Sequence, residues 1–376
     1  MKAKEMIGNV RAYFASNGYC LAEGLAENLF LGLQTKSVVL LAGDSDTPKS
    51  HLARIFAQAL GASEENGRFQ MIQVQPDWLA PSDLYGRVNL EGVFLPGAII
   101  DFIKQAQQDS ENPYFLCLEG IGLSSAEYYL NDLISGLLAK HIPEQERVCK
   151  PLVTEAYFRE DAAAAQKYGT IYTPENLYLI GTVHMDQASF PLNQRFLDRV
   201  HTVRVLSDDL MPQAETGREV QLQPVPNSVL MPRYTQYVRE GEHWDRVLEY
   251  FSIFQQINSI LTKAHAYVEY TLRDQVVVYL MHNLSAGLME EDLAMDLALI
   301  QYVLPRLQGS RKMVMDTLCR LFDYCVGACE ETGEGRTGEQ LLAAARKDGC
   351  RYPRTAEILA QMVCKCEKDD FTSLWL

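Results

Sequence analysis

Short apolar stretches alternate with helical patterns through the first half of the chain. Stretches at 37–42, 69–74, 114–118, 177–183 and 200–206 predict strands, and residues 38–42 are apolar throughout, as in a strand buried on both faces. Apolar residues at helical spacing over 49–60, 96–108 and 124–139 predict helices, the second of which begins at Pro96. Strands that alternate with helices indicate a parallel sheet covered by helices on both faces.

The remaining segments predict the domain organisation. Helical spacing over residues 1–35 predicts two helices before the first strand, and the proline-rich residues 207–240 predict a linker or an irregular excursion. From about residue 243 the pattern is helical, with interruptions at Pro305, at the glycine-rich stretch 332–338 and at Pro353. We therefore expect N-terminal helices at 1–36, an α/β nucleotide-binding-like domain at 37–206, a linker at 207–242, and an all-helical lid or C-terminal domain at 243–376.

Composition narrows the class of protein. Of the 376 residues, 47% are hydrophobic and 22% are charged, which is typical of a folded globular chain. The net charge of −15 argues against a protein that coats nucleic acid or an anionic membrane by itself. No apolar run approaches the roughly 20 residues of a membrane span, and the nine cysteines form no C-x-x-C pair. We expect a cytoplasmic protein with no membrane contact and no direct binding of nucleic acid.

Residues 43–50 nearly match a phosphate-binding loop. The pattern G-x-x-x-x-G-K-S/T, between a strand and a helix, keeps its first glycine, Lys49 and Ser50 here, but its second glycine is Pro48. Proline has no N–H to offer a phosphate and fixes φ near −65°. Asp44 and Asp46 add negative charge beside a polyanion. From this loop alone, weak nucleotide binding and an ordinary strand-to-helix turn are about equally good interpretations.

Several further motifs carry a family resemblance that covers nearly the whole chain. Together with the degenerate loop, the chain resembles the AAA+ ATPases of the McrB type, the nucleotide-driven subunits of 5-methylcytosine-dependent restriction systems. The resemblance implies an AAA+ P-loop-type parallel sheet followed by a helical lid. The motifs lie at residues 43–50, 81–97, 115–124 with 127–133, 174–186, 193–199, 272–274, 304–309 and 371–375.

The chemistry that this resemblance implies is metal-assisted hydrolysis of ATP or GTP with Mg²⁺. Lys49 would hold the β- and γ-phosphates, and Ser50 and Glu119 would hold the metal. Arg195 and Arg199 match basic positions that act on a neighbouring subunit's γ-phosphate, and Arg273 resembles the second sensor arginine of the lid. The residues that would surround the nucleotide at the loop are Gly43, Asp44, Ser45, Asp46, Thr47, Lys49, Ser50 and His51.

Three positions depart from the family pattern in the reaction shell. Pro48 replaces the second loop glycine, Gly120 replaces the glutamate that polarises water, and His184 replaces the usual sensor asparagine. Removal of a positioned base typically costs 10²–10⁴-fold in rate. The sequence therefore predicts a degenerate NTPase with little or no turnover, which binds ATP or GTP with Mg²⁺ weakly or has no cofactor.

Other polar residues have plainer interpretations. His201 near a strand end is expected at the surface or in a turn, and His51 on the first turn of a helix is expected to be solvated. Asp132 and Asp186 could join Glu119 in a metal site, although solvated carboxylates are the simpler interpretation for Asp132. No nuclease motif is spaced convincingly.

Three hypotheses follow for function. The first is a structural or regulatory subunit of a homo- or hetero-oligomeric AAA+ ring, with a nuclease or an intact AAA+ protein as partner. The second is an active motor in which Glu127 or His184 positions the attacking water. The third is an interaction module that needs no nucleotide. A role in restriction or defence against phage is implied by the resemblance alone.

Overall fold

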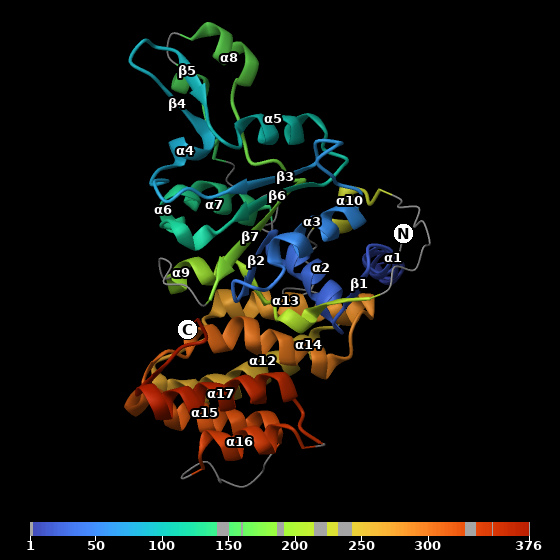
Figure 1. Ribbon diagram of the computed structural model, residues 1–376, viewed down its shortest axis with the longest axis vertical. Helices are drawn as coiled ribbons and strands as arrows, with labels where there is room; N and C mark the ends of the chain where they lie inside the picture. The colour runs from blue at the N-terminus through green and yellow to red at the C-terminus, as the bar shows by residue number, and fades with distance from the viewer. Residues whose placement is uncertain are drawn as a thin grey trace. The chain divides into compact units, whose positions relative to one another are not determined.

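The structure is a computed structural model. It describes residues 3–140, 150–158, 161–185, 192–213, 224–231, 243–327, 336–347 and 349–375. The chain divides into two compact units, residues 1–235 and 236–376 (Figure 1). Each unit is described by itself below.

The first unit is built on a five-stranded parallel sheet. The strands are β2 (Val38–Gly43), β3 (Phe69–Gln73), β6 (Tyr114–Glu119), β7 (Leu177–His184) and β8 (His201–Arg204). They lie in the order β3-β6-β7-β2-β8, with every neighbouring pair parallel. Strands β6, β7 and β2 are therefore adjacent, and their carboxyl ends meet at one edge of the sheet.

Successive side chains of a strand point to opposite faces of the sheet, and helices cover both faces. Val39 and Leu41 of β2 line one small apolar space together with Leu33 of α2 (Leu25–Lys36) and Phe56 of α3 (Lys49–Ala59). On the other side, Gly181 approaches Ile121 of the 3-10 helix after β6 so closely that a Cβ would lie 2.1 Å from its Cδ1. The predicted parallel sheet flanked by helices, followed by a helical region, is confirmed.

The predicted helix from Pro96 is wrong at its start. Pro96 ends β5 (Phe94–Pro96), which pairs antiparallel with β4 (Gly86–Val88), and α5 (Ile100–Gln108) begins four residues later. Phe94 holds this hairpin in place, because its ring packs edge-on against Phe158 at 4.9 Å and Tyr168 at 5.3 Å. Helical spacing at 96–99 therefore reflects the packing of a strand and its turn, and proline is tolerated at a strand end.

Two other predicted segments are subdivided. The helix expected over 124–139 is broken at Leu130 into α6 (Ala126–Tyr129) and α7 (Asn131–Ala139). Between α1 (Ala3–Ser16) and α2, a short strand β1 (Tyr19–Leu21) pairs antiparallel with β9 (Leu210–Pro212). Part of the predicted linker is thus paired with the N-terminal region, and its residues 214–223 and 232–242 lie outside the described residues.

Two insertions pack together beside α5. The first holds α4 (Pro81–Tyr85) and the β4–β5 hairpin, and the second holds the 3-10 helix Glu155–Phe158 and α8 (Ala162–Tyr168). The Asp161 carboxylate accepts the N–H of Ala164 at 2.9 Å, which caps α8, and the N–H of Phe94 at 2.9 Å. One side chain therefore joins the hairpin to the helix.

The second unit is helical. Its helices are α12 (Trp244–Leu261), α13 (Tyr270–Ala286), α14 (Glu291–Ala298), α15 (Arg311–Val326), α16 (Gly338–Ala345) and α17 (Pro353–Asp369). The predicted breaks at Pro305 and Pro353 are a 3-10 turn, Leu304–Arg306, and the first residue of α17. The buried Asp296 carboxylate accepts the N–H groups of Arg354 and Thr355, which satisfies two donors at the start of α17.

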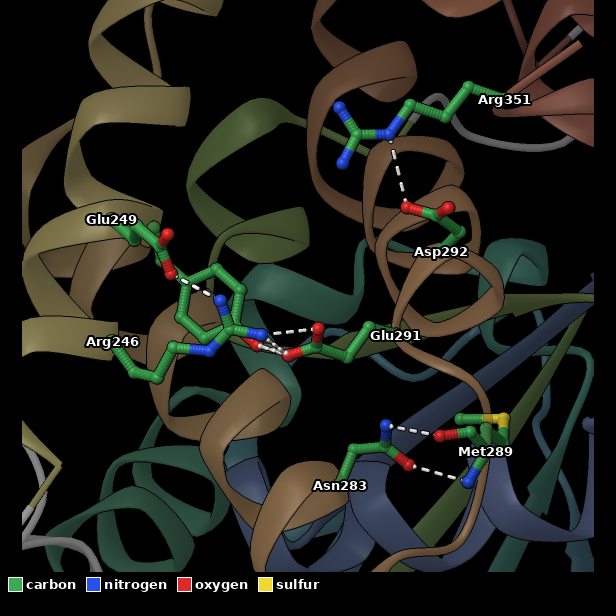
Figure 2. Close-up of polar contacts among 8 residues, drawn as sticks. Arg246, Glu249, Asn283, Met289, Glu291, Asp292 and Arg351 are labelled. Atoms are coloured by element: carbon green, nitrogen blue, oxygen red, sulfur yellow. Dashed lines mark hydrogen bonds and ion pairs between the residues drawn. The ribbon is translucent and has the colours of Figure 1, made fainter.

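Polar contacts around α14 fix the local geometry of this unit (Figure 2). The Arg246 guanidinium lies between the carboxylates of Glu249 and Glu291, and thereby links α12 to α14. The Asn283 side chain both donates to and accepts from the Met289 backbone at 2.9 Å, which closes the turn between α13 and α14. Because exposed ion pairs contribute only about 0–1 kcal/mol, the two ion pairs of Arg246 orient the helices more than they stabilise them.

None of the described helices combines the length and the apolar character that crossing a bilayer requires.

Candidate functional site

The edge where β2, β6 and β7 end collects the residues that the sequence singled out. Gly43 ends β2, Glu119 ends β6 and His184 ends β7. Gly43 and His184 are direct partners in the parallel register, and the Met185 N–H donates to the Gly43 carbonyl at 3.1 Å. The carboxyl edge of an open parallel sheet is where such folds place their ligands.

The loop from β2 to α3 requires glycine at its first position. A Cβ on Gly43 would lie 2.3 Å from the Val205 carbonyl oxygen and 2.7 Å from the Thr47 hydroxyl. Pro48 then precedes α3 with φ −82°, and its carbonyl accepts the Leu52 N–H at 2.8 Å. Proline therefore fits the start of the helix, although it leaves this position without a donor.

Lys49 is directed into its own loop. Its side chain is buried, and its ammonium donates to the Gly43 carbonyl at 3.0 Å, the Asp44 carbonyl at 2.5 Å and the Thr47 hydroxyl at 2.9 Å. Asp44, Ser45 and Asp46 are exposed at the tip of the loop.

His51 lies on the first turn of α3. It is exposed, as expected, and its ring lies edge-on to Tyr19 at 4.9 Å. Desolvation of part of the ring, followed by the positive charge of Arg54, lowers the pKa of His51.

The two predicted metal ligands are brought together. The Ser50 hydroxyl donates a hydrogen bond to the Glu119 carboxylate, although the two residues are 69 positions apart. A hydroxyl and a carboxylate oxygen suit Mg²⁺, which commonly takes few protein ligands and completes its shell with phosphate and water. Among the described residues no group of three or more His, Cys, Asp or Glu side chains could hold a metal, and Asp186 lies outside them.

Gly120 has a conformation that disfavours any side chain. Its φ is +73°, in the left-handed region, and its N–H donates to the buried Thr182 hydroxyl at 3.0 Å. A Cβ at this position would lie 2.9 Å from Leu123 Cδ1. The position at which the resemblance predicts a water-polarising glutamate is therefore shaped for glycine.

Glu127, the predicted alternative for positioning water, has a structural contact. It lies on α6, and its carboxylate accepts the N–H of Asn193 at 3.1 Å. One of its oxygens therefore holds the start of α9 (Gln194–Leu197).

The two predicted arginines differ in their surroundings. Arg199 is half-buried and donates to the Asn131 side chain at 2.8 Å and to the Ser135 hydroxyl at 2.5 Å, both on α7. Burial lowers the pKa of Arg199, opposed by the charge of Asp132. Arg195 on α9 is exposed and makes no side-chain hydrogen bond or ion pair with any residue that the structure describes.

Sequence reasoning missed the buried polar groups that hold this arginine segment. The Lys36 ammonium is fully buried and donates to the carbonyls of Asp198 at 2.7 Å and Val200 at 3.0 Å. His201 is also fully buried, with Nε2 3.2 Å from the Asn28 side-chain oxygen, so the expected surface position is wrong. Residues 28, 32 and 36 share one face of α2, and this four-residue spacing was the available signal.

Arg273 belongs to the second unit. It lies on α13, where its guanidinium is 4.0 Å from the Phe251 ring centre and 5.0 Å from that of Tyr270. It also forms an ion pair with Asp274 at 2.8 Å. These contacts hold the guanidinium within its own unit, flanked by two aromatic rings.

Comparisons with known proteins add little to this geometry. A domain of unknown function, DUF8727, matches residues 228–371, and no curated protein matches the chain. A proposed ATPase of Cytophaga hutchinsonii is 14% identical, with 76% of this chain and 82% of that one covered and a TM-score of 0.40. NtrX of Brucella abortus is 15% identical, with 54% of this chain and 40% of that one covered and a TM-score of 0.31. A RuvB variant of Thermotoga maritima is 12% identical, with 89% of this chain and 87% of that one covered and a TM-score of 0.27. The fold assignment therefore rests on the sheet and its strand order.

Proposed function

We propose that this chain is a hydrolysis-impaired AAA+ protein of the McrB type, which acts as a structural or regulatory subunit of an oligomer. The observation that carries the proposal is Gly120. Its left-handed backbone disfavours a side chain, and a Cβ there would lie 2.9 Å from Leu123 Cδ1, so this position supplies no base. Pro48 removes a further phosphate donor from the loop.

Weak binding of Mg²⁺-nucleotide is part of the proposal. Ser50 and Glu119 would hold the metal, and Lys49 would meet the phosphates once its ammonium leaves the loop carbonyls. A bound Mg²⁺ would neutralise phosphate charge. ATP and GTP both fit, because no described contact distinguishes the two bases.

The exposed guanidinium of Arg195 supports a role toward a neighbouring subunit. Arg199 is committed to α7 within its own chain, whereas Arg195 is exposed and unpaired among the described residues. We therefore assign to Arg195 the contribution to a partner's triphosphate. An oligomer of this chain, or of this chain with an intact AAA+ protein or a nuclease, would use it, in keeping with a role in restriction or defence.

A hydrolysis assay on the purified chain tests the proposal. We expect turnover of Mg-ATP and Mg-GTP far below the roughly 1–10³ s⁻¹ of typical enzymes, because Gly120 supplies no base. Light scattering with and without nucleotide reports assembly, and Glu119→Ala serves as the control for contaminating activity. Turnover near 1 s⁻¹ that Glu119→Ala abolishes would contradict the proposal and favour an active motor.

A further inference from the structure

We infer that Thr47 and Lys49 form an autoinhibitory latch, closed on the Asp44 carbonyl, that holds the loop after β2 shut against nucleotide. The inference rests on the proposed function, because it concerns the same triphosphate site. It goes further because it assigns the low affinity of that site for nucleotide to the bond between the Lys49 ammonium and the Asp44 carbonyl, and the control of this bond to Thr47.

The Asp44 carbonyl oxygen is the acceptor that Thr47 and Lys49 share in the latch. It accepts three hydrogen bonds, from the Thr47 N–H at 3.1 Å, the Thr47 hydroxyl at 2.8 Å and the Lys49 ammonium at 2.5 Å. The ammonium also donates to the Thr47 hydroxyl at 2.9 Å and to the Gly43 carbonyl at 3.0 Å. An ammonium has three donors, and these three acceptors, all among the described residues, match that number.

The same contacts use the backbone donors that a phosphate would need. A phosphate cradle is made by consecutive N–H groups that point toward the ligand. Here the Thr47 N–H is bonded to the Asp44 carbonyl, the Lys49 N–H is bonded to the Thr47 carbonyl at 2.9 Å, and Pro48 has no N–H. With Lys49 2% and Thr47 9% exposed, a triphosphate must break these bonds before it can bind.

Thr47 is the control point because its hydroxyl serves both partners. It donates to the Asp44 carbonyl and accepts from the Lys49 ammonium, so valine of the same shape removes both bonds at once. A hydrogen bond to a charged group is among the stronger ones in proteins. Its loss raises the population of the open loop, and with it the apparent affinity for nucleotide.

The affinity of the full chain for Mg-ATP and Mg-GTP tests the latch. Each is titrated in competition with a ribose-labelled fluorescent nucleotide. Thr47→Val is expected to bind about tenfold more tightly than the wild type, and Thr47→Ser, which keeps the hydroxyl, should bind like the wild type. Thr35→Val is the matched control, since the buried Thr35 hydroxyl donates only to the Leu31 carbonyl within α2.

The outcomes separate the latch from the proposed function. Equal or weaker binding by Thr47→Val, or the same gain in Thr35→Val, overturns the latch. Binding by Thr47→Val where the wild type shows none supports the latch but removes weak wild-type binding from the proposed function. If neither protein binds, the latch is overturned. Thr47→Ala takes the place of Thr47→Val should the latter fail to fold.

Discussion

A Gly120→Glu variant is expected to hydrolyse nucleotide no faster than the wild type and to lose about 2–3 kcal/mol of unfolding free energy. A left-handed backbone costs a non-glycine residue about 1–2 kcal/mol. A Cβ 2.9 Å from Leu123 Cδ1 adds overpacking. A glutamate restored in sequence alone would therefore not be held where the base must act.

A second glycine separates the cost of the left-handed backbone from the cost of the contact with Leu123. Gly287 has φ +60°, but a Cβ there would meet nothing within 4 Å, so Gly287→Glu should carry the backbone cost without the contact. Urea unfolding and the hydrolysis assay are the measurements. A Gly120→Glu protein as stable as the wild type, or one that gains about 10²-fold in turnover, would contradict the structural reason given for the missing base.

The sequence predicted most of the sheet and the frame of the site. All five strands were foreseen, and β2, β6 and β7 most clearly, because residues buried on both faces leave a continuous apolar pattern. The loop at 43–50 was foreseen because glycine, lysine and serine keep their spacing, and Glu119 was placed correctly at the end of β6. Parallel strands bring their carboxyl ends to one edge, so proximity between Ser50 and Glu119 follows from the topology.

Other features were set by tertiary contacts that no local pattern records. Pro96 lies in a strand because Phe94 beside it packs on residues more than 60 positions away. His201 is buried because α2 presents Asn28, Gly32 and Lys36 to it, and a Cβ on Gly32 would lie only 2.2 Å from its ring. The folded-back position of Lys49 depends on loop carbonyls, which every sequence has.

His201 is expected to make the chain acid-sensitive. Burial, followed by the positive charge of Lys36, lowers the pKa of His201 from 6.5 to about 3. The unfolded chain therefore takes up this proton first, and the stability that the neutral ring contributes is complete above pH 6.5. It is lost as the pH falls from 6.5 toward 3. Between pH 7.5 and pH 5.0 this one group should remove about 2 kcal/mol of unfolding free energy.

The measurement is the difference in unfolding free energy between these two pH values, compared across variants. His201→Phe keeps a ring against Gly32 but cannot titrate, so its stability should fall by about 2 kcal/mol less than that of the wild type on the same acidification. His51→Phe is the control, because His51 is exposed and its removal should alter the pH dependence far less. Identical pH profiles for the wild type and His201→Phe would mean that the folded protein takes up the His201 proton as readily as the unfolded chain does. Lys36 and the surrounding packing would then not hold the ring neutral.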